Sequence, residues 1–189
     1  MPLLARVLWL ALPVILAGAV HIAVIRLHLL PGLARLPLDG GTTFRGRRLL
    51  GDHKTVRGAV VMACATTVFA GAEGALAARS SWARGLSLVS VHPLLWGLLL
   101  GLGYVAGELP NSFLKRQLDV APGEAAPGSL APVFWLADQL DSLCGVLTFM
   151  ACVWTPPLAV IALLGLVTLV VHPTMAFLMM GLGLKERIG

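Results

Sequence analysis

The sequence predicts an all-α integral membrane protein of one domain, in which five transmembrane helices carry two long polar loops on one face. Of the 189 residues, 58% are hydrophobic and 12% are charged, whereas a soluble domain has roughly 25% charged residues. Five apolar stretches each have close to the roughly 20 residues that a helix needs to cross a bilayer. They occupy most of residues 1–189, so little is left for a separate soluble domain.

The expected spans are residues 7–25, 59–78, 86–106, 133–153 and 158–180. The first is a span rather than a cleaved signal peptide, because Arg6 alone is a meagre basic segment and the apolar stretch exceeds a usual signal core. The fourth begins just after Pro132, a normal place for proline at a helix start. The short link Thr155-Pro156-Pro157 predicts that the fourth and fifth spans are antiparallel neighbours.

The basic residues are distributed unevenly between the two sides of the membrane. All of the 14 Lys and Arg residues except Arg6, Arg79 and Arg84 lie in the two long loops, at the end of the first span or at the C-terminus. Because cytoplasmic loops carry the Lys/Arg excess, we expect a multi-pass protein of the cytoplasmic membrane with its N-terminus outside and both loops and the C-terminus inside. A basic face of this kind suits nucleotides or anionic lipid headgroups, although topology alone also explains it.

Two carboxylates, Asp138 and Asp141, lie in the fourth apolar span. Residues three apart face the same way on a helix, and two anions on one face of a membrane helix are costly unless something positive neutralises them. They lie about 9 Å and about 13 Å along the helix from Pro132, in the half nearer the loops. Mg²⁺ is held by one or two carboxylates with waters and substrate phosphates, so the pair is predicted to bind Mg²⁺. Favourable placement near a helix N-terminus, or pairing with basic residues of a neighbouring helix, would also explain the acids.

The first loop, residues 30–58, ends in the segment GDHKTVRG. Gly51 lets backbone amides approach a polyphosphate, and Thr55 can donate a hydrogen bond. Lys54 supplies a point charge and Arg57 a planar fork for phosphate oxygens. The segment is not a Walker A motif, and taken alone it also fits a basic anchor beside the membrane.

The second loop, residues 107–132, opens with a polar piece at 111–118 and continues as a Pro/Gly/Ala-rich connector. If the polar piece is helical, Ser112, Lys115 and Arg116 share one face that can contact phosphate. A positive stop signal is the alternative, and Asn111 and Glu108 also fit the end of the third span. The two loops and the acid pair together predict one site for chemistry on a nucleotide at the membrane face.

Three ordered segments resemble the CDP-archaeol synthases, small five-span relatives of the CDP-diacylglycerol synthases (phosphatidate cytidylyltransferases). They are LDGGTTFRGRRLLGDHKTVRG, GELPNSFLKRQL and PVFWLADQLD, which cover the two cytoplasmic loops and the start of the fourth span. The remaining spans match only in number and order. The candidate residues are Lys54, Arg57, Lys115 and Arg116 for catalysis, the same four with Gly51, Thr55, Asn111 and Ser112 for CTP and its phosphates, and Asp138 and Asp141 for the metal.

The resemblance implies transfer of CMP from CTP to a membrane lipid phosphate, with Mg²⁺ as cofactor and pyrophosphate as the second product. The larger relatives continue past K-R with a K-D pair and P-G-H-G-G, which this chain lacks, and this favours the archaeol type. CDP-diacylglycerol synthesis from phosphatidic acid in a bacterium is the alternative reaction. A small ion or solute transporter using the two aspartates, and a non-catalytic scaffold that binds anionic lipid, are the alternatives from other classes. No nucleic-acid partner is expected, and a homodimer is left open.

Overall fold

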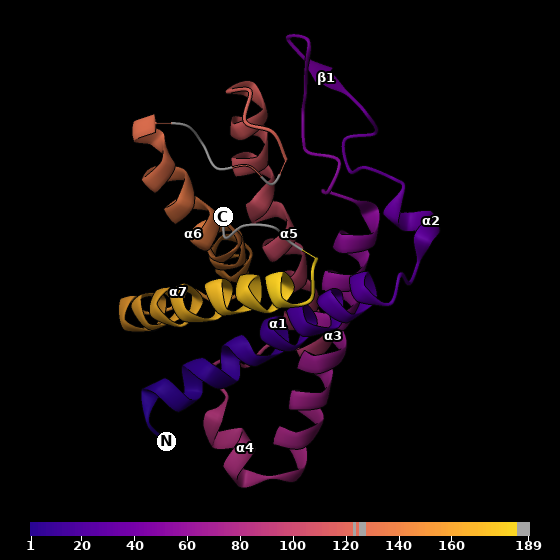
Figure 1. The fold of residues 1–189 in the computed structure, drawn as a ribbon. Coiled ribbons are helices and arrows are strands. Elements are labelled where there is room, and N and C mark those ends of the chain that lie inside the picture. Colours follow the sequence, from indigo (N-terminus) through magenta and orange to yellow (C-terminus); the bar gives the residue numbers. More distant parts are fainter. Residues whose placement is uncertain (123, 125–127, 185–189) are drawn as a thin grey trace.

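The structure, a computed structural model, describes residues 1–122, 124 and 128–184. Its long helices are α1 (Leu3–Arg26), α3 (Val56–Arg79), α5 (Pro93–Gln117), α6 (Ala131–Ala151) and α7 (Leu158–Gly181) (Figure 1). These five helical segments are long and apolar enough to cross a membrane, which confirms the predicted number and order of spans. Lys185 and Arg187 of the predicted basic face, and residues 123 and 125–127 of the predicted connector, lie outside the described residues.

Shorter elements join the spans at the two ends of the bundle. After α1 come α2 (Pro31–Ala34) and an antiparallel hairpin of β1 (Thr43–Phe44) and β2 (Arg47–Arg48). This hairpin projects beside the end of α5 (Figure 1). At the opposite end α4 (Ser81–Leu86) follows α3. The 3-10 helix η1 (Gly128–Leu130) leads directly into α6 at the same end as the hairpin.

The helix α5 differs from the predicted third span at both ends. It begins at Pro93 instead of residue 86, because proline suits the first turn of a helix, and residues 81–86 form α4 instead. It continues to Gln117 instead of ending at 106, running through Pro110, which removes only one helical hydrogen bond. Asn111 and Arg116 in this extension are buried. The polar piece expected to open the second loop is therefore the last two turns of a spanning helix.

The helix α5 lies between α3 and α6 and approaches both closely through glycines. A methyl group at Gly101 would come within 2.7 Å of Cα of Ala63 on α3, and one at Gly103 within 2.8 Å of the carbonyl oxygen of Gly145 on α6. Real Cβ atoms essentially never show contacts under 3.0 Å. Side chains at these positions would hold the helices apart, so the glycines make α5 the centre of the fold.

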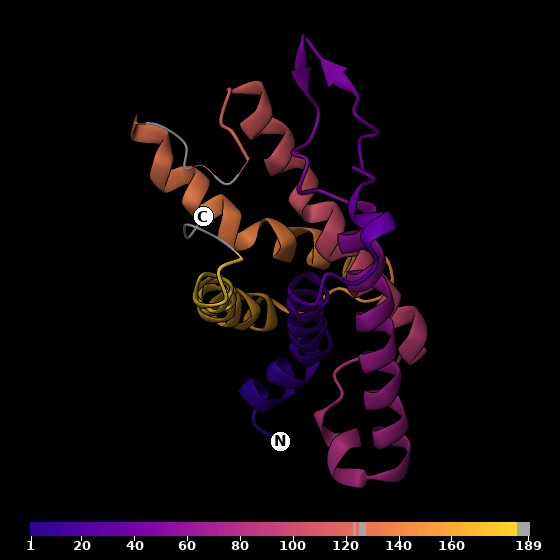
Figure 2. The same ribbon diagram turned by 45° about the vertical axis from the view of Figure 1, so that its right-hand side comes forward.

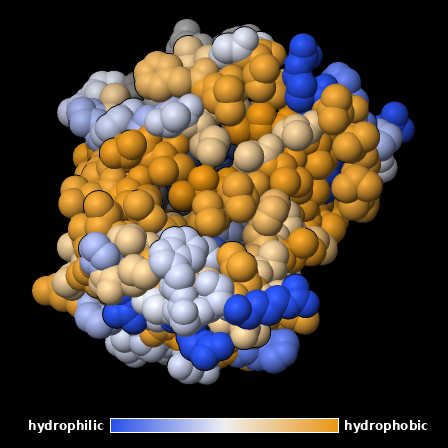
Figure 3. All heavy atoms as spheres, turned by 90° about the horizontal axis from the view of Figure 1, so that it is seen from below, coloured by the Kyte–Doolittle hydropathy of each residue, from blue (hydrophilic) through white to orange (hydrophobic). Residues whose placement is uncertain are grey.

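The helices α1 and α7 contact each other and pack across this central group (Figure 1). In Figure 2 α7 is seen nearly end-on while α6 lies across the view, so α7 crosses α6 steeply. The prediction that the two helices are neighbours is confirmed, but the prediction that they run antiparallel was wrong. The short link only reverses the chain, whereas α7 takes its direction from burying Val160 and Leu164 against both α1 and α6. Apolar side chains cover much of the surface in Figure 3, as contact with lipid requires.

Candidate active site

One face of α5 presents polar side chains at successive turns. Glu108, Asn111, Ser112 and Lys115 are spaced three, four and seven residues from the first, which places them in one row along the helix. Asn111 and Ser112 are buried. The row follows the apolar part of the span towards the hairpin. These polar side chains therefore lie at the end of a membrane helix and not in a separate loop.

The two predicted aspartates of α6 meet this row. The side-chain nitrogen of Asn111 donates to Oδ1 of Asp138 at 2.7 Å and to Oδ2 of Asp141 at 2.8 Å. Lys115 Nζ lies 2.6 Å from Oδ2 of Asp138 and forms an ion pair with it. One amide and one ammonium thus offset the repulsion between the two carboxylates. Both aspartates, Asn111 and Lys115 are brought together as predicted.

Glycines on both helices allow this convergence. A Cβ at Gly107, one residue before Glu108, would overlap the carbonyl oxygen of Asp141 and lie 2.9 Å from the backbone nitrogen of Gly145. The two helix backbones are therefore in direct contact beside the acids. Short side chains such as Asn and Asp can bridge from one helix to the other only at such a separation.

Glu108 is a third acid at the site, and the sequence reasoning missed its role. Its carboxylate forms an ion pair with Lys54 from the first loop. Tyr104, one turn below on α5, places its hydroxyl against the side chains of Glu108 and Ser142. The available signal was spacing, because Glu108 lies three residues before Asn111 on the same helical face. Lys54 is thereby held beside the aspartates from the opposite side to Lys115.

The first loop approaches α5 above this cluster. The backbone nitrogen of Gly51 lies 3.5 Å from the hydroxyl oxygen of Ser112, and a Cβ at Gly51 would run into the ring of His53 and lie 3.4 Å from Arg116 Nη1. Arg116 is 8% exposed, and its Nε and Nη1 have no hydrogen-bond partner in the described part of the chain. A buried guanidinium with unused donors is suited to bind an anion such as phosphate.

Burial and the neighbouring Lys54 and Arg116 lower the pKa of His53 to about 4. The imidazole is therefore neutral at neutral pH, in a region where several cations already repel added positive charge.

Two predicted site residues have other contacts. Thr55 is the N-cap of α3, and its hydroxyl accepts a hydrogen bond from the backbone nitrogen of Gly58. Arg57 lies in the first turn of α3 and donates from Nη1 to the carbonyl oxygen of Leu29 at 3.4 Å. The Nε of Arg57 is buried without a hydrogen-bond partner in the described part of the chain. The Arg57 hydrogen bond thus goes to Leu29 and not to an aspartate, whereas Lys54, three residues earlier, reaches the site through Glu108.

The oxygen donors at the centre of the site fit a hard divalent cation. The two aspartates converge on Asn111, and the buried side-chain oxygen of Asn111 has no hydrogen-bond partner among the described residues. Among the residues that the structure describes, no three His, Cys, Asp or Glu side chains cluster closely enough to hold a metal by themselves. The set matches Mg²⁺, which binds one or two carboxylates and completes its shell with water and phosphate oxygens.

Half-buried acids, two lysines paired with them and a buried arginine with unused donors in the described part of the chain lie together at the end of apolar helices. This arrangement is typical of an intramembrane enzyme with an anionic substrate. The family model described as CarS-like, CDP-archaeol synthase, matches residues 1–188. The chain belongs to the CDP-archaeol synthase family and is an enzyme of lipid biosynthesis; the transporter and scaffold alternatives are not favoured.

Individual relatives agree with this assignment. The chain is 36% identical over 139 residues to the CDP-archaeol synthase of Methanopyrus kandleri, covering 72% of this chain and 69% of that protein. It is 38% identical to that of Aeropyrum pernix, covering 67% and 64%, and 33% identical to that of Halorubrum lacusprofundi, covering 80% and 82%. A solved structure described as an intramembrane enzyme for archaeal membrane lipid biosynthesis superposes with a TM-score of 0.60 at 28% identity, covering 90% of this chain and 92% of that one.

Proposed function

We propose that this chain transfers CMP from CTP to an isoprenoid lipid phosphate and so makes a CDP-lipid of the archaeol type with release of pyrophosphate. The observation that carries the proposal is the joined cluster in which Asn111 bridges Asp138 and Asp141 between Lys54 on one side and Lys115 on the other. Membership of the CDP-archaeol synthase family supports the choice of nucleotide and lipid.

The proposed Mg²⁺ would be held by Asp138 and Asp141, with the unpartnered oxygen of Asn111 as a further donor. Bound there, it would neutralise charge on the CTP phosphates. The resemblance and the donor set support this cofactor.

The remaining chemistry needs positioning and charge neutralisation. An oxygen of the lipid phosphate attacks the α-phosphorus of CTP, and the bond from that phosphorus to the bridging oxygen of the β-phosphate breaks. Lys54, Lys115 and Arg116 stabilise the charge that moves onto the departing pyrophosphate. A phosphate monoester is already ionised near neutral pH, so the proposed reaction requires no general base.

A cavity of about 190 Å³ gives the lipid a place to lie. Helices α1, α5, α6 and α7 line it together with Met62 of α3, and its walls are mostly apolar, from Leu10 and Met150 at one end to Tyr104, Ser142 and His172 at the other. Ser142 directly follows Asp141 in the chain. A hydrocarbon chain in this cavity would therefore have its phosphate end at the acid cluster, which supports a reaction between a water-soluble nucleotide and a membrane lipid.

The charge distribution supports a cytoplasmic site. Arg6 donates to the carbonyl oxygen of Ser87, and Arg84 to those of Ala77 and Ala78, at the end of the bundle that holds α4. The hairpin and the acid cluster lie at the other, more basic end. The orientation with the N-terminus outside, and a homodimer, stay predictions.

The test is CDP-lipid formation by purified protein in detergent with Mg²⁺, radiolabelled CTP and either digeranylgeranylglyceryl phosphate or phosphatidic acid. We expect a labelled CDP-lipid with the isoprenoid substrate and loss of at least about 100-fold in rate for Asp138→Ala. Preference for phosphatidic acid would reassign the lipid. A folded protein that makes no CDP-lipid with either substrate, or an Asp138→Ala variant of normal activity, would overturn the proposal.

A further inference from the structure

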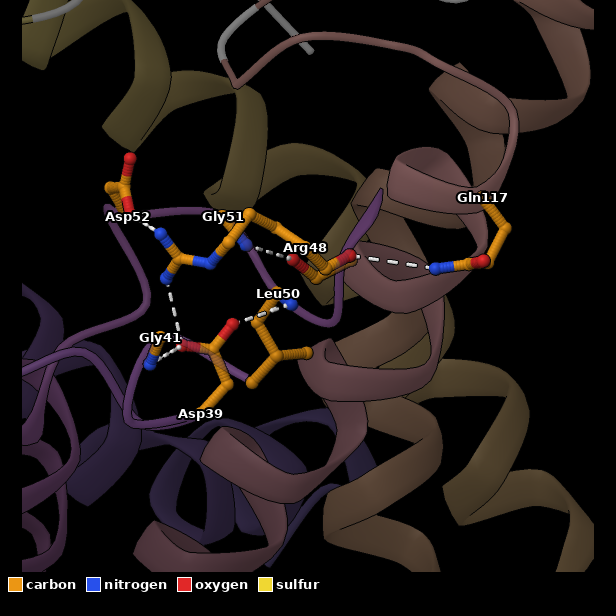
Figure 4. A network of polar contacts seen from close by, with 8 residues as sticks. Asp39, Gly41, Arg48, Leu50, Gly51, Asp52 and Gln117 are labelled. Atoms are coloured by element: carbon orange, nitrogen blue, oxygen red, sulfur yellow. Dashed lines mark hydrogen bonds and ion pairs between the residues drawn. The ribbon is translucent and has the colours of Figure 1, made fainter. Parts of the chain in front are cut away.

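Asp39, in the first loop, accepts three hydrogen bonds although its surroundings are otherwise exposed. Its Oδ1 accepts from the backbone nitrogen of Gly41 at 3.0 Å and from Arg48 Nη2 at 2.8 Å, and its Oδ2 accepts from the backbone nitrogen of Leu50 at 2.9 Å (Figure 4). The side chain is 1% exposed. A carboxylate so enclosed and fully hydrogen-bonded fixes the chain around it.

The contacts of Asp39 continue into the candidate active site. Leu50, held at its backbone nitrogen, directly precedes Gly51 (Figure 4). The backbone nitrogen of Gly51 in turn faces the hydroxyl oxygen of Ser112 on α5. The carbonyl oxygen of Gly51 then accepts from the backbone nitrogen of Lys54 at 2.9 Å, and the carbonyl oxygen of Lys54 accepts from Leu38, next to Asp39, at 2.8 Å. The carboxylate thus lies at the centre of a closed loop whose far side carries Lys54.

The same network ties the loop to the end of α5. Arg48, paired with Asp39, also pairs with Asp52 at 2.5 Å, and its carbonyl oxygen accepts from the side chain of Gln117 at 3.4 Å (Figure 4). On the hairpin, Arg47 pairs with Asp119 just beyond α5. Within the described part of the chain, each side-chain partner in this network belongs to the loop or to the end of α5, so the network determines where the loop lies rather than how the spans pack.

We propose that Asp39 is a positioning residue, which through Arg48 and Leu50 holds Gly51 and Lys54 over the acid cluster so that they can bind the CTP phosphates. This inference rests on the proposed function for the identity of the nucleotide. Asp39 itself touches no reacting group in this scheme. It acts by pre-ordering a glycine-containing loop that would otherwise lose conformational entropy on binding the nucleotide.

Asparagine cannot replace this carboxylate, although it has nearly the same shape. Both oxygens of Asp39 accept hydrogen bonds, whereas asparagine has only one acceptor oxygen and would turn an NH₂ group towards a donor in either orientation. Burial by itself would raise the pKa of Asp39, but the hydrogen bonds from Arg48, Leu50 and Gly41 outweigh it and hold the pKa below its usual value. The carboxylate therefore stays ionised throughout the neutral range.

The experiment compares Asp39→Asn with Asp52→Asn. The control removes a carboxylate from the same arginine, but Asp52 is 78% exposed, and its side chain accepts no hydrogen bond from the backbone of the described residues. For Asp39→Asn we expect the KM for CTP to rise on the order of tenfold, with the KM for the lipid phosphate unchanged. Hydrogen exchange at residues 41–50 should accelerate on the order of tenfold, with no change within α3 and α6. Asp52→Asn should match the unsubstituted protein in all three measurements.

The possible outcomes separate this inference from the proposed function. Equal CTP kinetics for both variants and the unsubstituted protein would overturn the positioning role. A parallel rise of the KM for CTP and the KM for the lipid phosphate, with faster hydrogen exchange throughout the spans, would also overturn it. Asp39 would then be a residue that stabilises the whole fold. If the unsubstituted protein makes no CDP-lipid, the proposed function fails. Hydrogen exchange at residues 41–50 then tests the positioning role by itself. If Asp39→Asn does not accelerate exchange there, the positioning role is refuted. Arg48→Lys, which keeps the charge and loses the fork, should shift both readouts in the same direction by a smaller factor.

Discussion

Substituting Gly107 by alanine would test whether the contact between α5 and α6 sets the geometry of the acid cluster. An added Cβ would overlap the carbonyl oxygen of Asp141 and lie 2.9 Å from the backbone nitrogen of Gly145. Both neighbours are helix backbone, which cannot turn aside as the end of a flexible side chain can. The two helices must therefore separate.

The size of the separation follows from these contacts. Ordinary van der Waals contact of a Cβ begins at 3.4 Å, so the contact with Gly145 alone requires about 0.5 Å, and the overlap with Asp141 raises the displacement to roughly 1 Å. Asn111 lies one turn further along α5 and bonds the two aspartates at 2.7 and 2.8 Å. A shift of that size would stretch both bonds beyond hydrogen-bond range. Because a misplacement of about 1 Å can cost about 100-fold in rate, we expect a loss of about 100-fold.

The assay is the initial rate of CDP-lipid formation in detergent, with thermal unfolding measured in the same detergent. The matched control is Gly165→Ala, because Gly165 also lies in a spanning helix, α7, and an added Cβ there meets nothing within 4 Å. We expect the control to keep the rate of the unsubstituted protein. A folded Gly107→Ala variant whose rate lies within about threefold of that value would refute the reasoning, since the displacement it assumes would then be harmless.

Three further predictions follow from the charges at the site. Glu108→Ala should lower the free energy of unfolding by about 2 kcal/mol, between the values for exposed and buried ion pairs, because Lys54 loses its partner. A double-mutant cycle with Lys54→Ala in thermal unfolding should show this coupling. Additive effects of the two substitutions would contradict it. Arg116→Lys should raise the KM for CTP about tenfold, since the unused Nε and Nη1 donors disappear, and an unchanged KM would remove Arg116 from the binding site. The folded protein holds the pKa of His53 at about 4, against an ordinary value of 6.5. Between these pH values the folded protein binds fewer protons at His53 than the unfolded chain does. The free energy of unfolding that depends on His53 should therefore be complete above pH 6.5 and fall as the pH drops towards 4. In thermal unfolding, His53→Gln should flatten this pH dependence, and an unaltered slope would assign it to another group.

Much of the candidate site could be predicted because it depends on local spacing. Asp138 and Asp141 lie three residues apart, so any helix through them presents both on one face, and the structure joins them as expected. Spacing places Glu108 on the same helical face as Asn111, but spacing alone could not identify its ion-pair partner. Its importance comes from Lys54, which is 54 residues away in the chain, and nothing in the sequence indicated that contact. Arg57 was selected by the same motif as Lys54, yet its guanidinium contacts Leu29 instead.

The sequence by itself determined the five spans, the basic end of the molecule and the residue types that carry the chemistry, because hydropathy and helical periodicity are properties of short segments. Tertiary structure alone decided where α5 ends, which direction α7 takes and which charges meet. A polar stretch such as 111–117 stays helical only because its side chains are buried against α6 and the first loop. Ion pairs between segments depend on the separation of helix backbones, and here direct contact at glycines sets that separation. This last factor is a property of the packed molecule, which no single segment encodes.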